Sequence, residues 1–239
     1  MAKGDERDGS ESVGVFSTLA YVLFVACAGL AVFAFVSVAR DGETRRRCGA
    51  LCLLQPSYVA DDRTAPDFTL SDMQGQKVTL SSYRGKVVVL NFWTKTCGPC
   101  LEEMPEISDL TKILKEGRDD VAVIAVSADN GPDDVKDTLK SVLREEPPFR
   151  IVFDPDQKII AGKYGTHLYP ETWIIDKRGI IRARFDGSRQ WSNSAVVEMI
   201  DEIRHGGYCP VELKDGKPEG DGAKACKEIG GSGLGSGGS

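Results

Sequence analysis

The sequence predicts an α/β domain preceded by one membrane-spanning helix, and two patterns indicate this. Residues 12–39 carry no charged side chain, and this run is longer than the roughly 20 residues that cross a bilayer. Further along, short runs of β-branched and aromatic residues alternate with segments of helical periodicity. That alternation is typical of strands buried between helices. We therefore expect one folded domain, over residues 65–205, behind a membrane anchor.

Composition excludes some classes of function. The 239-residue chain has a net charge of -6 and no basic stripe, so nucleic acid is not an expected partner. Seven cysteines are many for a protein of a reducing compartment, and their spacing shows no zinc ribbon. We expect the domain to lie in an oxidising compartment and to hold no metal.

The N-terminal region divides into a flank (1–11), an anchor (12–39) and a charged tether (40–64). The apolar run is too long, and the flank too acidic, for a cleaved signal peptide. Arg40 and Arg45–Arg47 follow the anchor, and the positive-inside rule alone would place the domain in the cytoplasm. The cysteine content favours the opposite side, which we adopt.

The centre of the domain is a buried strand followed by a helix. Residues 86–93 form a continuous apolar run, and apolar side chains recur at helical spacing from Leu101 to Leu114. Between them lies Cys97-Gly98-Pro99-Cys100. A cysteine where a helix begins has free backbone N–H groups and the helix dipole to stabilise its thiolate, and Lys95 adds a positive charge nearby.

This spacing predicts a dithiol that exchanges disulfides with other proteins. Cys97 would attack a substrate disulfide, and Cys100, one turn into the helix and more shielded, would resolve the mixed disulfide. The alternatives are a permanent structural disulfide or half of a zinc site, which the strand-to-helix context disfavours.

The remaining patterns complete the expected domain. In chain order they predict a hairpin over 68–80, a strand over 121–126, a helix over 135–143, a strand over 150–153, an antiparallel pair at 172–176 and 180–185, and a closing helix over 196–203. Residues 206–239 are rich in glycine, and we expect a flexible tail without a core.

Three motifs resemble one family. Trp93, the Cys97–Cys100 motif and Pro105 resemble thioredoxin, and Ala65–Leu70, Cys100–Pro105 and Tyr169–Asp176 resemble its TlpA and ResA type. The resemblance implies a thioredoxin fold with an N-terminal β-hairpin and a central helix-strand insertion. It also implies a protein anchored in the inner membrane with its domain in the periplasm or an equivalent space. Such proteins need no cofactor.

The resemblance further implies the partners and the roles of residues. The substrates are protein disulfides, with apocytochrome c as the leading candidate, and a membrane thiol donor supplies electrons. Cys97 and Cys100 are expected to be catalytic, with Glu103 as acid/base because Asn91 stands where thioredoxins have an aspartate. The residues expected to contact substrate are Trp93, Gly98, Pro99, Tyr169, Pro170 and Glu171, with Pro170 preceded by a cis bond.

Two other functions remain open at this point. Thr94 and Cys97 have the Thr-x-x-Cys spacing of peroxiredoxins, whereas Cys48, Cys52 and His167 are soft ligands that could hold Cu(I). Thr96 departs from the family, which has tryptophan there. The four cysteines outside the motif and the anchor are Cys48, Cys52, Cys209 and Cys226. We expect them to form two structural disulfides, and the sequence leaves all three pairings possible.

Overall fold

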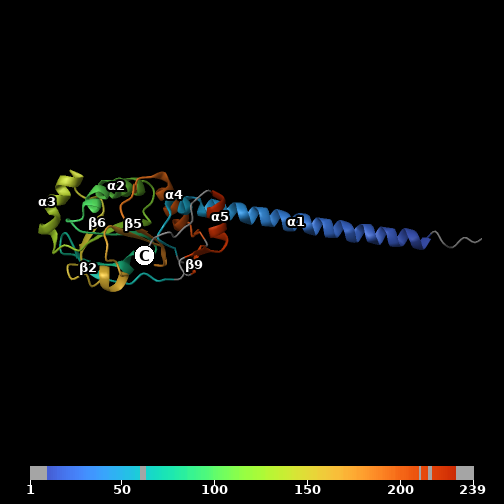
Figure 1. The fold of residues 1–239 in the computed structure, drawn as a ribbon, viewed down its shortest axis with the longest axis horizontal. Coiled ribbons are helices and arrows are strands. Elements are labelled where there is room, and N and C mark those ends of the chain that lie inside the picture. The colour runs from blue at the N-terminus through green and yellow to red at the C-terminus, as the bar shows by residue number, and fades with distance from the viewer. Residues whose placement is uncertain (1–9, 60–62, 210, 215–216, 230–239) are drawn as a thin grey trace, which may run out of the picture. The chain divides into compact units, whose positions relative to one another are not determined.

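The computed structural model describes residues 10–59, 63–209, 211–214 and 217–229 (Figure 1). The chain forms two compact units, Met1–Glu43 and Thr44–Ser239. Helix α1 runs from Ser10 to Leu54 and is, among the described residues, the one helix long and apolar enough to cross a membrane. None of its apolar window is buried. Most of the predicted flank, residues 1–9, lies outside the described residues.

The second unit is built on an eight-stranded mixed sheet with the order β1-β8-β7-β4-β5-β6-β2-β3. The central strand is β4, which is parallel to β5 and antiparallel to β7. The strands are β1 (Tyr58–Val59), β2 (Thr69–Asp72), β3 (Lys77–Thr79), β4 (Val87–Trp93), β5 (Val121–Ser127), β6 (Arg150–Phe153), β7 (Glu171–Ile175) and β8 (Ile181–Asp186).

Strand β4 explains why the sheet needs a core on both faces. All seven of its residues are buried. Val87, Val89 and Trp93 belong to one hydrophobic core, whereas Val88, Leu90 and Phe92 belong to a second. Successive side chains of a strand point to opposite faces, so a continuous apolar run must be covered twice. The prediction of a doubly buried strand is confirmed.

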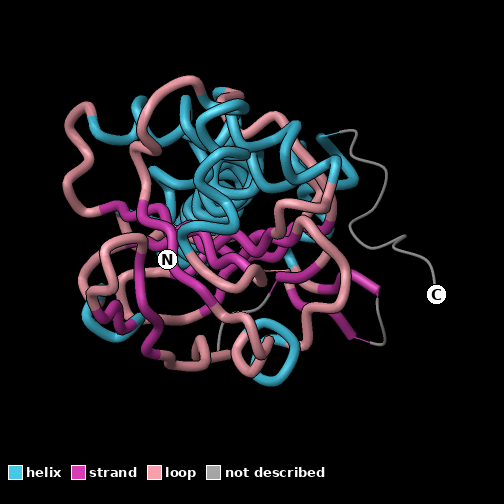
Figure 2. The backbone as a smooth tube through the Cα atoms, turned by 90° about the vertical axis from the view of Figure 1, so that its left-hand side faces the viewer, coloured by secondary structure: helices cyan, strands magenta, loops and turns pink. Residues whose placement is uncertain are grey.

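Helices cover one face of the sheet and short turns cover the other (Figure 2). The first core is closed by α2 (Gly98–Lys115), α3 (Pro132–Leu143), α4 (Ser194–Arg204) and residues 48–52 at the end of α1. The second core lies under the 3₁₀ helix Leu80–Tyr83 and the π-helix Ile160–Tyr164. The active-site helix therefore packs against the same face as the end of α1.

The predicted hairpin and insertion are confirmed. Strands β2 and β3 pair in antiparallel fashion, and β2 also joins β6 at the sheet edge. Helix α3 and strand β6 follow β5, and β6 pairs with β5 in parallel. Strands β7 and β8 form the predicted antiparallel pair before α4.

The predicted tether and tail differ from the structure. Residues 44–54 continue α1 as a helix, and the chain ends in the small sheet of β9 (Glu212–Lys214) and β10 (Lys217–Glu219) and in helix α5 (Asp221–Ile229). Cys48 is bonded to Cys209, and Cys52 to Cys226. The tail has few apolar residues, but two disulfides attach it to the buried end of α1, and this gives it a defined position. Residues 230–239, at the end of the predicted tail, lie outside the described residues.

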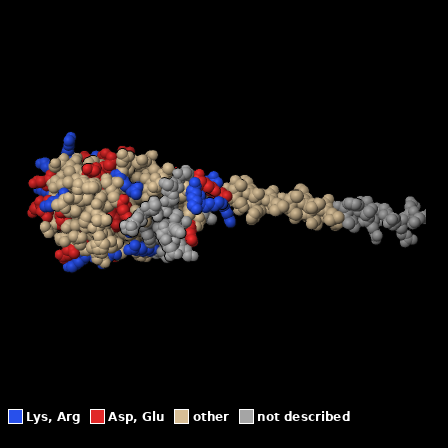
Figure 3. All heavy atoms as spheres, in the orientation of Figure 1, with Lys and Arg blue, Asp and Glu red and all other residues tan. Residues whose placement is uncertain are grey.

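Much of the visible face of the second unit carries no charge, and side chains of both signs lie mainly along its margins (Figure 3). In the first unit, the described part of the apolar segment carries no charged atoms up to residue 39.

Candidate functional site

The dithiol lies where β4 ends and α2 begins. Cys97 is the N-cap residue of α2, and its Sγ accepts a hydrogen bond from the Cys100 backbone N–H at 3.1 Å. The two residues are joined by a disulfide. Cys97 is half-buried, whereas Cys100 is fully buried. Pro99 lies in the first turn, where a missing N–H costs no helical hydrogen bond.

The segment before Cys97 is held by an acid that the sequence analysis did not single out. Asp129 accepts hydrogen bonds from Thr94 Oγ1 at 2.9 Å, from the Lys95 backbone N–H at 2.9 Å and from Ser127 Oγ at 2.8 Å. Asp129 follows β5, which is parallel to β4, so the ends of both strands meet at the dithiol. The prediction of two neighbouring buried strands could therefore have pointed to Asp129, because it directly follows the second of them.

The expectation for Lys95 needs correction. Its Nζ lies 2.6 Å from Asp134 Oδ1, and this partner raises the pKa of Lys95. The positive charge is therefore offset by a carboxylate on α3. The helix start, rather than Lys95, is the main source of positive potential at Cys97.

Glu103 lies on the inner face of α2, three residues after Cys100, and is 1% exposed. Its Oε1 accepts a hydrogen bond from Asn91 Nδ2 at 2.8 Å. Its Oε2 accepts one from Trp191 Nε1 at 3.0 Å and one from the Arg189 backbone N–H at 3.2 Å. Burial raises the pKa of Glu103 to about 7, although these hydrogen bonds and the charge of Arg189 act in the opposite direction.

A carboxyl group with a pKa near neutrality can accept and return a proton at physiological pH. Asn91 fixes its position from the sheet side, because the same Nδ2 also donates to Thr172 Oγ1 at 2.9 Å. Arg189 and Trp191 were not among the residues predicted for this site. They follow β8, far from α2 in sequence, and no local spacing connects them to Glu103.

The loop before β7 lies beside the dithiol. Strands β4 and β7 are antiparallel with Phe92 opposite Glu171, so residues just before Glu171 lie next to the segment that follows β4. The Tyr169–Pro170 peptide bond is cis, as the resemblance implies. Tyr169 is half-buried, and its hydroxyl donates to Gln157 Oε1 at 3.1 Å. Leu168, which sequence analysis did not select, is 84% exposed.

Three of the expected substrate contacts are buried: Trp93, Pro170 and Glu171. Trp93 is fully buried within the first core, because its position in β4 directs it under the helices. Glu171 is buried and accepts hydrogen bonds from Thr166 Oγ1 and, at 2.7 Å, from Trp173 Nε1. Burial raises the pKa of Glu171. Gly98 and Pro99 are exposed, so the accessible surface comprises these two residues, the Cys97 sulfur and the loop of Leu168 and Tyr169.

The copper-site hypothesis is not supported by the geometry. Cys48 and Cys52 are bonded to Cys209 and Cys226, and His167 is an exposed loop residue. No group of three or more His, Cys, Asp or Glu side chains suited to a metal occurs among the described residues.

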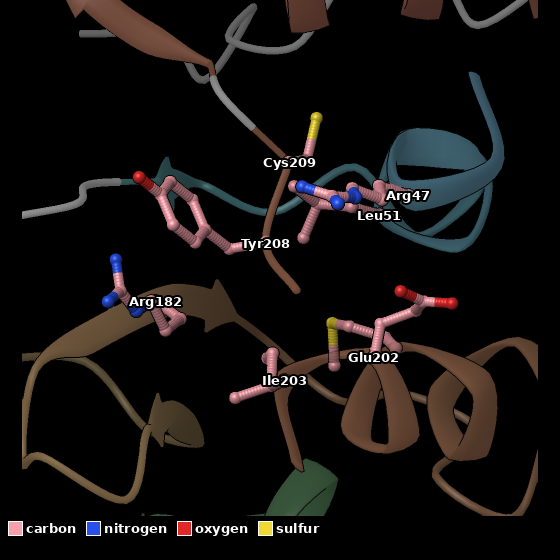
Figure 4. A pocket seen from close by; sticks show the side chains of 8 residues that line it. Arg47, Leu51, Arg182, Glu202, Ile203, Tyr208 and Cys209 are labelled. Carbon is pink, nitrogen blue, oxygen red and sulfur yellow. The ribbon is translucent and has the colours of Figure 1, made fainter. Parts of the chain in front are cut away.

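A cavity beside Cys209 is too small for a substrate. It lies between the end of α1, α4 and the loop of Tyr208 and has a volume of about 20 Å³, enough for a single water molecule (Figure 4). Its lining residues are Arg47, Leu51, Arg182, Met199, Glu202, Ile203, Tyr208 and Cys209.

Comparisons with known proteins agree with this site. A sequence model of the AhpC/TSA family matches residues 62–184. The thiol-disulfide oxidoreductase ResA of Geobacillus thermodenitrificans is 37% identical over 151 residues, covering 63% of this chain and 82% of ResA. The thioredoxin-like protein YneN of Bacillus subtilis is 35% identical over 124 residues, covering 52% of this chain and 70% of YneN.

A crystal structure supports the same assignment. A putative thiol:disulfide interchange protein DsbE from Chlorobium tepidum superposes with a TM-score of 0.54 and 28% identity, covering 62% of this chain and 99% of that one. The fold, the Cys97–Cys100 pair at the strand-to-helix junction and these relatives agree. The chain therefore belongs to the AhpC/TSA family and is a thioredoxin-fold thiol-disulfide oxidoreductase of the ResA type.

Proposed function

We propose that this protein is a membrane-anchored reductase of protein disulfides that acts outside the cytoplasm through Cys97, Cys100 and Glu103. The observation that carries the proposal is the unequal exposure of the two cysteines. Cys97 is half-buried at the start of α2, whereas Cys100 is buried beneath it. An incoming disulfide can reach one sulfur, and that sulfur has the backbone environment that stabilises a thiolate.

The reaction proceeds in two exchanges. The Cys97 thiolate attacks one sulfur of the substrate disulfide, forming a mixed disulfide and releasing the other substrate sulfur as a thiolate, which takes a proton from solvent. Cys100 then loses its proton and attacks Cys97 Sγ, releasing the second substrate thiolate. The enzyme is left with the Cys97–Cys100 disulfide, the form present in this structure. A membrane thiol donor supplies two electrons and two protons to restore the dithiol.

Glu103 handles the proton of Cys100. A buried thiol is costly to ionise without a nearby base. Glu103 lies one turn along the same helix, and its pKa of about 7 suits both acceptance and return of a proton. The exposed loop of Leu168 and Tyr169 beside the cis bond offers a surface for a substrate peptide.

The anchor and the relatives support the proposed cellular location. Helix α1 is long and apolar enough to cross a membrane, and the chain resembles ResA. Four further cysteines in disulfides fit an oxidising compartment. We infer that α1 holds the protein in the inner membrane with the second unit in the periplasm or an equivalent space. A C-terminal alkaline phosphatase fusion should be active in cells, and an inactive fusion beside an active cytoplasmic reporter would contradict this placement.

Apocytochrome c is the proposed substrate class. The test uses full-length protein in detergent and two oxidised peptides, one with a Cys-x-x-Cys-His disulfide and one with alanine in place of the histidine. Faster reduction of the first peptide would support an apocytochrome substrate. Equal rates would remove that assignment and leave a general reductase. Consumption of hydrogen peroxide faster than disulfide reduction would instead favour the peroxidase alternative.

A further inference from the structure

The C-terminal end of α1 is capped by a side chain from a distant loop. The last carbonyls of any helix have no intrahelical donor. Gln55 follows the helix with φ of 47°, a left-handed conformation that ends it. Arg189, from the loop between β8 and α4, donates from Nη1 to the Leu54 carbonyl at 2.7 Å and from Nη2 to the Gln55 carbonyl at 3.3 Å. A cation at this end of a helix is also favoured by the helix dipole.

The same loop holds the proposed proton acceptor. The Arg189 backbone N–H and the Trp191 indole N–H both donate to Glu103 Oε2. A three-residue segment therefore binds the end of α1 on one side and the catalytic helix on the other. Arg189 is further fixed by packing of its guanidinium over the Phe185 ring, 4.8 Å from the centroid.

The capped end of α1 is itself held in place by burial and by two disulfides. Leu51 is buried, and the disulfides Cys48–Cys209 and Cys52–Cys226 lie within two turns of the capped carbonyls. All of these residues lie in the second unit. A loop that rests on this end has little freedom to move, and neither do the two N–H groups that it directs at Glu103.

We propose that Arg189 is a positioning residue. By capping the end of α1 it fixes the position of the loop of residues 189–191, and this loop holds the Glu103 carboxylate in place. Any effect of Arg189 on the rate of disulfide reduction rests on the proposed acid/base role of Glu103. Its effect on the position and titration of the Glu103 carboxylate does not depend on that role.

The surroundings of Glu103 set the expected direction. The groups that contact it are Asn91 from β4 and Arg189 and Trp191 from the loop, and Cys100 precedes it by three residues on the same helix. The hydrogen bonds and the Arg189 charge lower the pKa of Glu103, against the effect of burial. If the cap is removed and the loop moves, the Glu103 carboxylate loses hydrogen-bond donors and a nearby cation. Its pKa should then rise.

The test measures the titration of Glu103 by infrared difference spectroscopy in oxidised full-length protein, with Glu103→Gln used to assign the carboxyl band. Arg189→Met keeps the volume and removes the cap and the charge. We expect the Glu103 midpoint to rise by roughly one pH unit. Arg46→Met is the matched control, because it removes an ion pair between the same helix and Glu202 of α4 and should leave the midpoint unchanged.

Arg189→Lys should restore the midpoint to near the wild-type value, because an ammonium group can cap the helix as well. If Arg189→Met does not fold, Arg189→Gln replaces it, with an upward shift again expected. A wild-type midpoint in the Met or Gln variant, or an equal shift in Arg46→Met, would overturn the proposal. If instead Glu103→Gln leaves the pH–rate profile unchanged, the acid/base role fails, while the infrared titration still decides the role of Arg189.

Discussion

The three disulfides of this protein are chemically alike but lie in opposite surroundings. Cys97–Cys100 spans a separation of 3 residues and lies at the start of a helix, with Cys97 half-buried. Cys48–Cys209 and Cys52–Cys226 span separations of 161 and 174, and all four of their residues are buried. Exchange requires access for an attacking thiolate and stabilisation of the leaving sulfur. Position alone therefore separates a redox centre from two structural links.

The largest expected effect comes from the redox pair. In Cys97→Ser the rate of disulfide reduction should fall to the background rate, because the accessible nucleophile is absent. Cys100→Ser should also stop turnover but should accumulate a mixed disulfide between Cys97 and substrate, visible by non-reducing electrophoresis and mass spectrometry. Equal trapping by both variants would show that the attacking sulfur is wrongly assigned.

The structural links should affect stability rather than rate. While Cys48–Cys209 remains, the second bond closes only a ring of about 20 residues, worth about 3 kcal/mol in the loop-entropy model. The double variant Cys52→Ser/Cys226→Ser should lose about that much free energy of unfolding in urea, and its reduction rate should change little. A loss of activity comparable with that of Cys97→Ser would contradict the separation of roles.

A smaller effect should appear in the pH dependence of stability. The pKa of Glu103 is about 7 in the folded protein against an ordinary value of 4.5. The folded state therefore binds more protons between these values, so the contribution of Glu103 to stability is present below pH 4.5 and is lost as pH rises to 7. The Glu103→Gln variant has no carboxyl group at this position, so it does not lose this stability as the pH rises. Its stability relative to wild type should rise by up to about 3 kcal/mol from pH 4.5 to pH 8.

The matched control for that measurement is Glu102→Gln, because Glu102 is the exposed neighbour of Glu103 on the same helix. Its stability difference from wild type should stay flat over the same range. A flat difference for Glu103→Gln as well would show that the buried carboxyl does not titrate differently in the folded protein.

The smallest expected effect concerns His167. It is exposed, and it is not brought together with Cys48 and Cys52. His167→Ala should leave the rate of disulfide reduction and the Cu(I) content of the oxidised protein unchanged. Stoichiometric Cu(I) in the wild type that His167→Ala loses would restore the copper-binding hypothesis.

The contrast between these regions also separates what sequence can and cannot predict. Strand β4, the dithiol and helix α2 are continuous in the chain, so periodicity located them. Glu103 could be selected as a candidate from its spacing to Cys100 and from the resemblance, and its acid/base role stays a prediction. Arg189 and Trp191 reach Glu103 only through the tertiary fold. Trp93 was expected to contact substrate from the resemblance, but it is buried because both faces of β4 are covered.

The tail shows the same limit. Residues 206–229 have too few apolar side chains to predict a packed segment from composition. Their order depends on cross-links to residues 48 and 52, and four cysteines allow three pairings that sequence alone does not distinguish. The Lys95 charge was likewise correctly located along the chain, but its partner Asp134 comes from another helix.

The central claim is that one disulfide exchanges while two remain closed. Thiol-labelling mass spectrometry of the full-length protein, equilibrated in a series of increasingly reducing dithiol buffers, measures all three bonds at once. The account predicts that Cys97 and Cys100 become labelled in mildly reducing buffers, while Cys48, Cys52, Cys209 and Cys226 stay bonded until far stronger reduction. Labelling of either long-range pair at the same or milder reduction than Cys97 and Cys100 would contradict it.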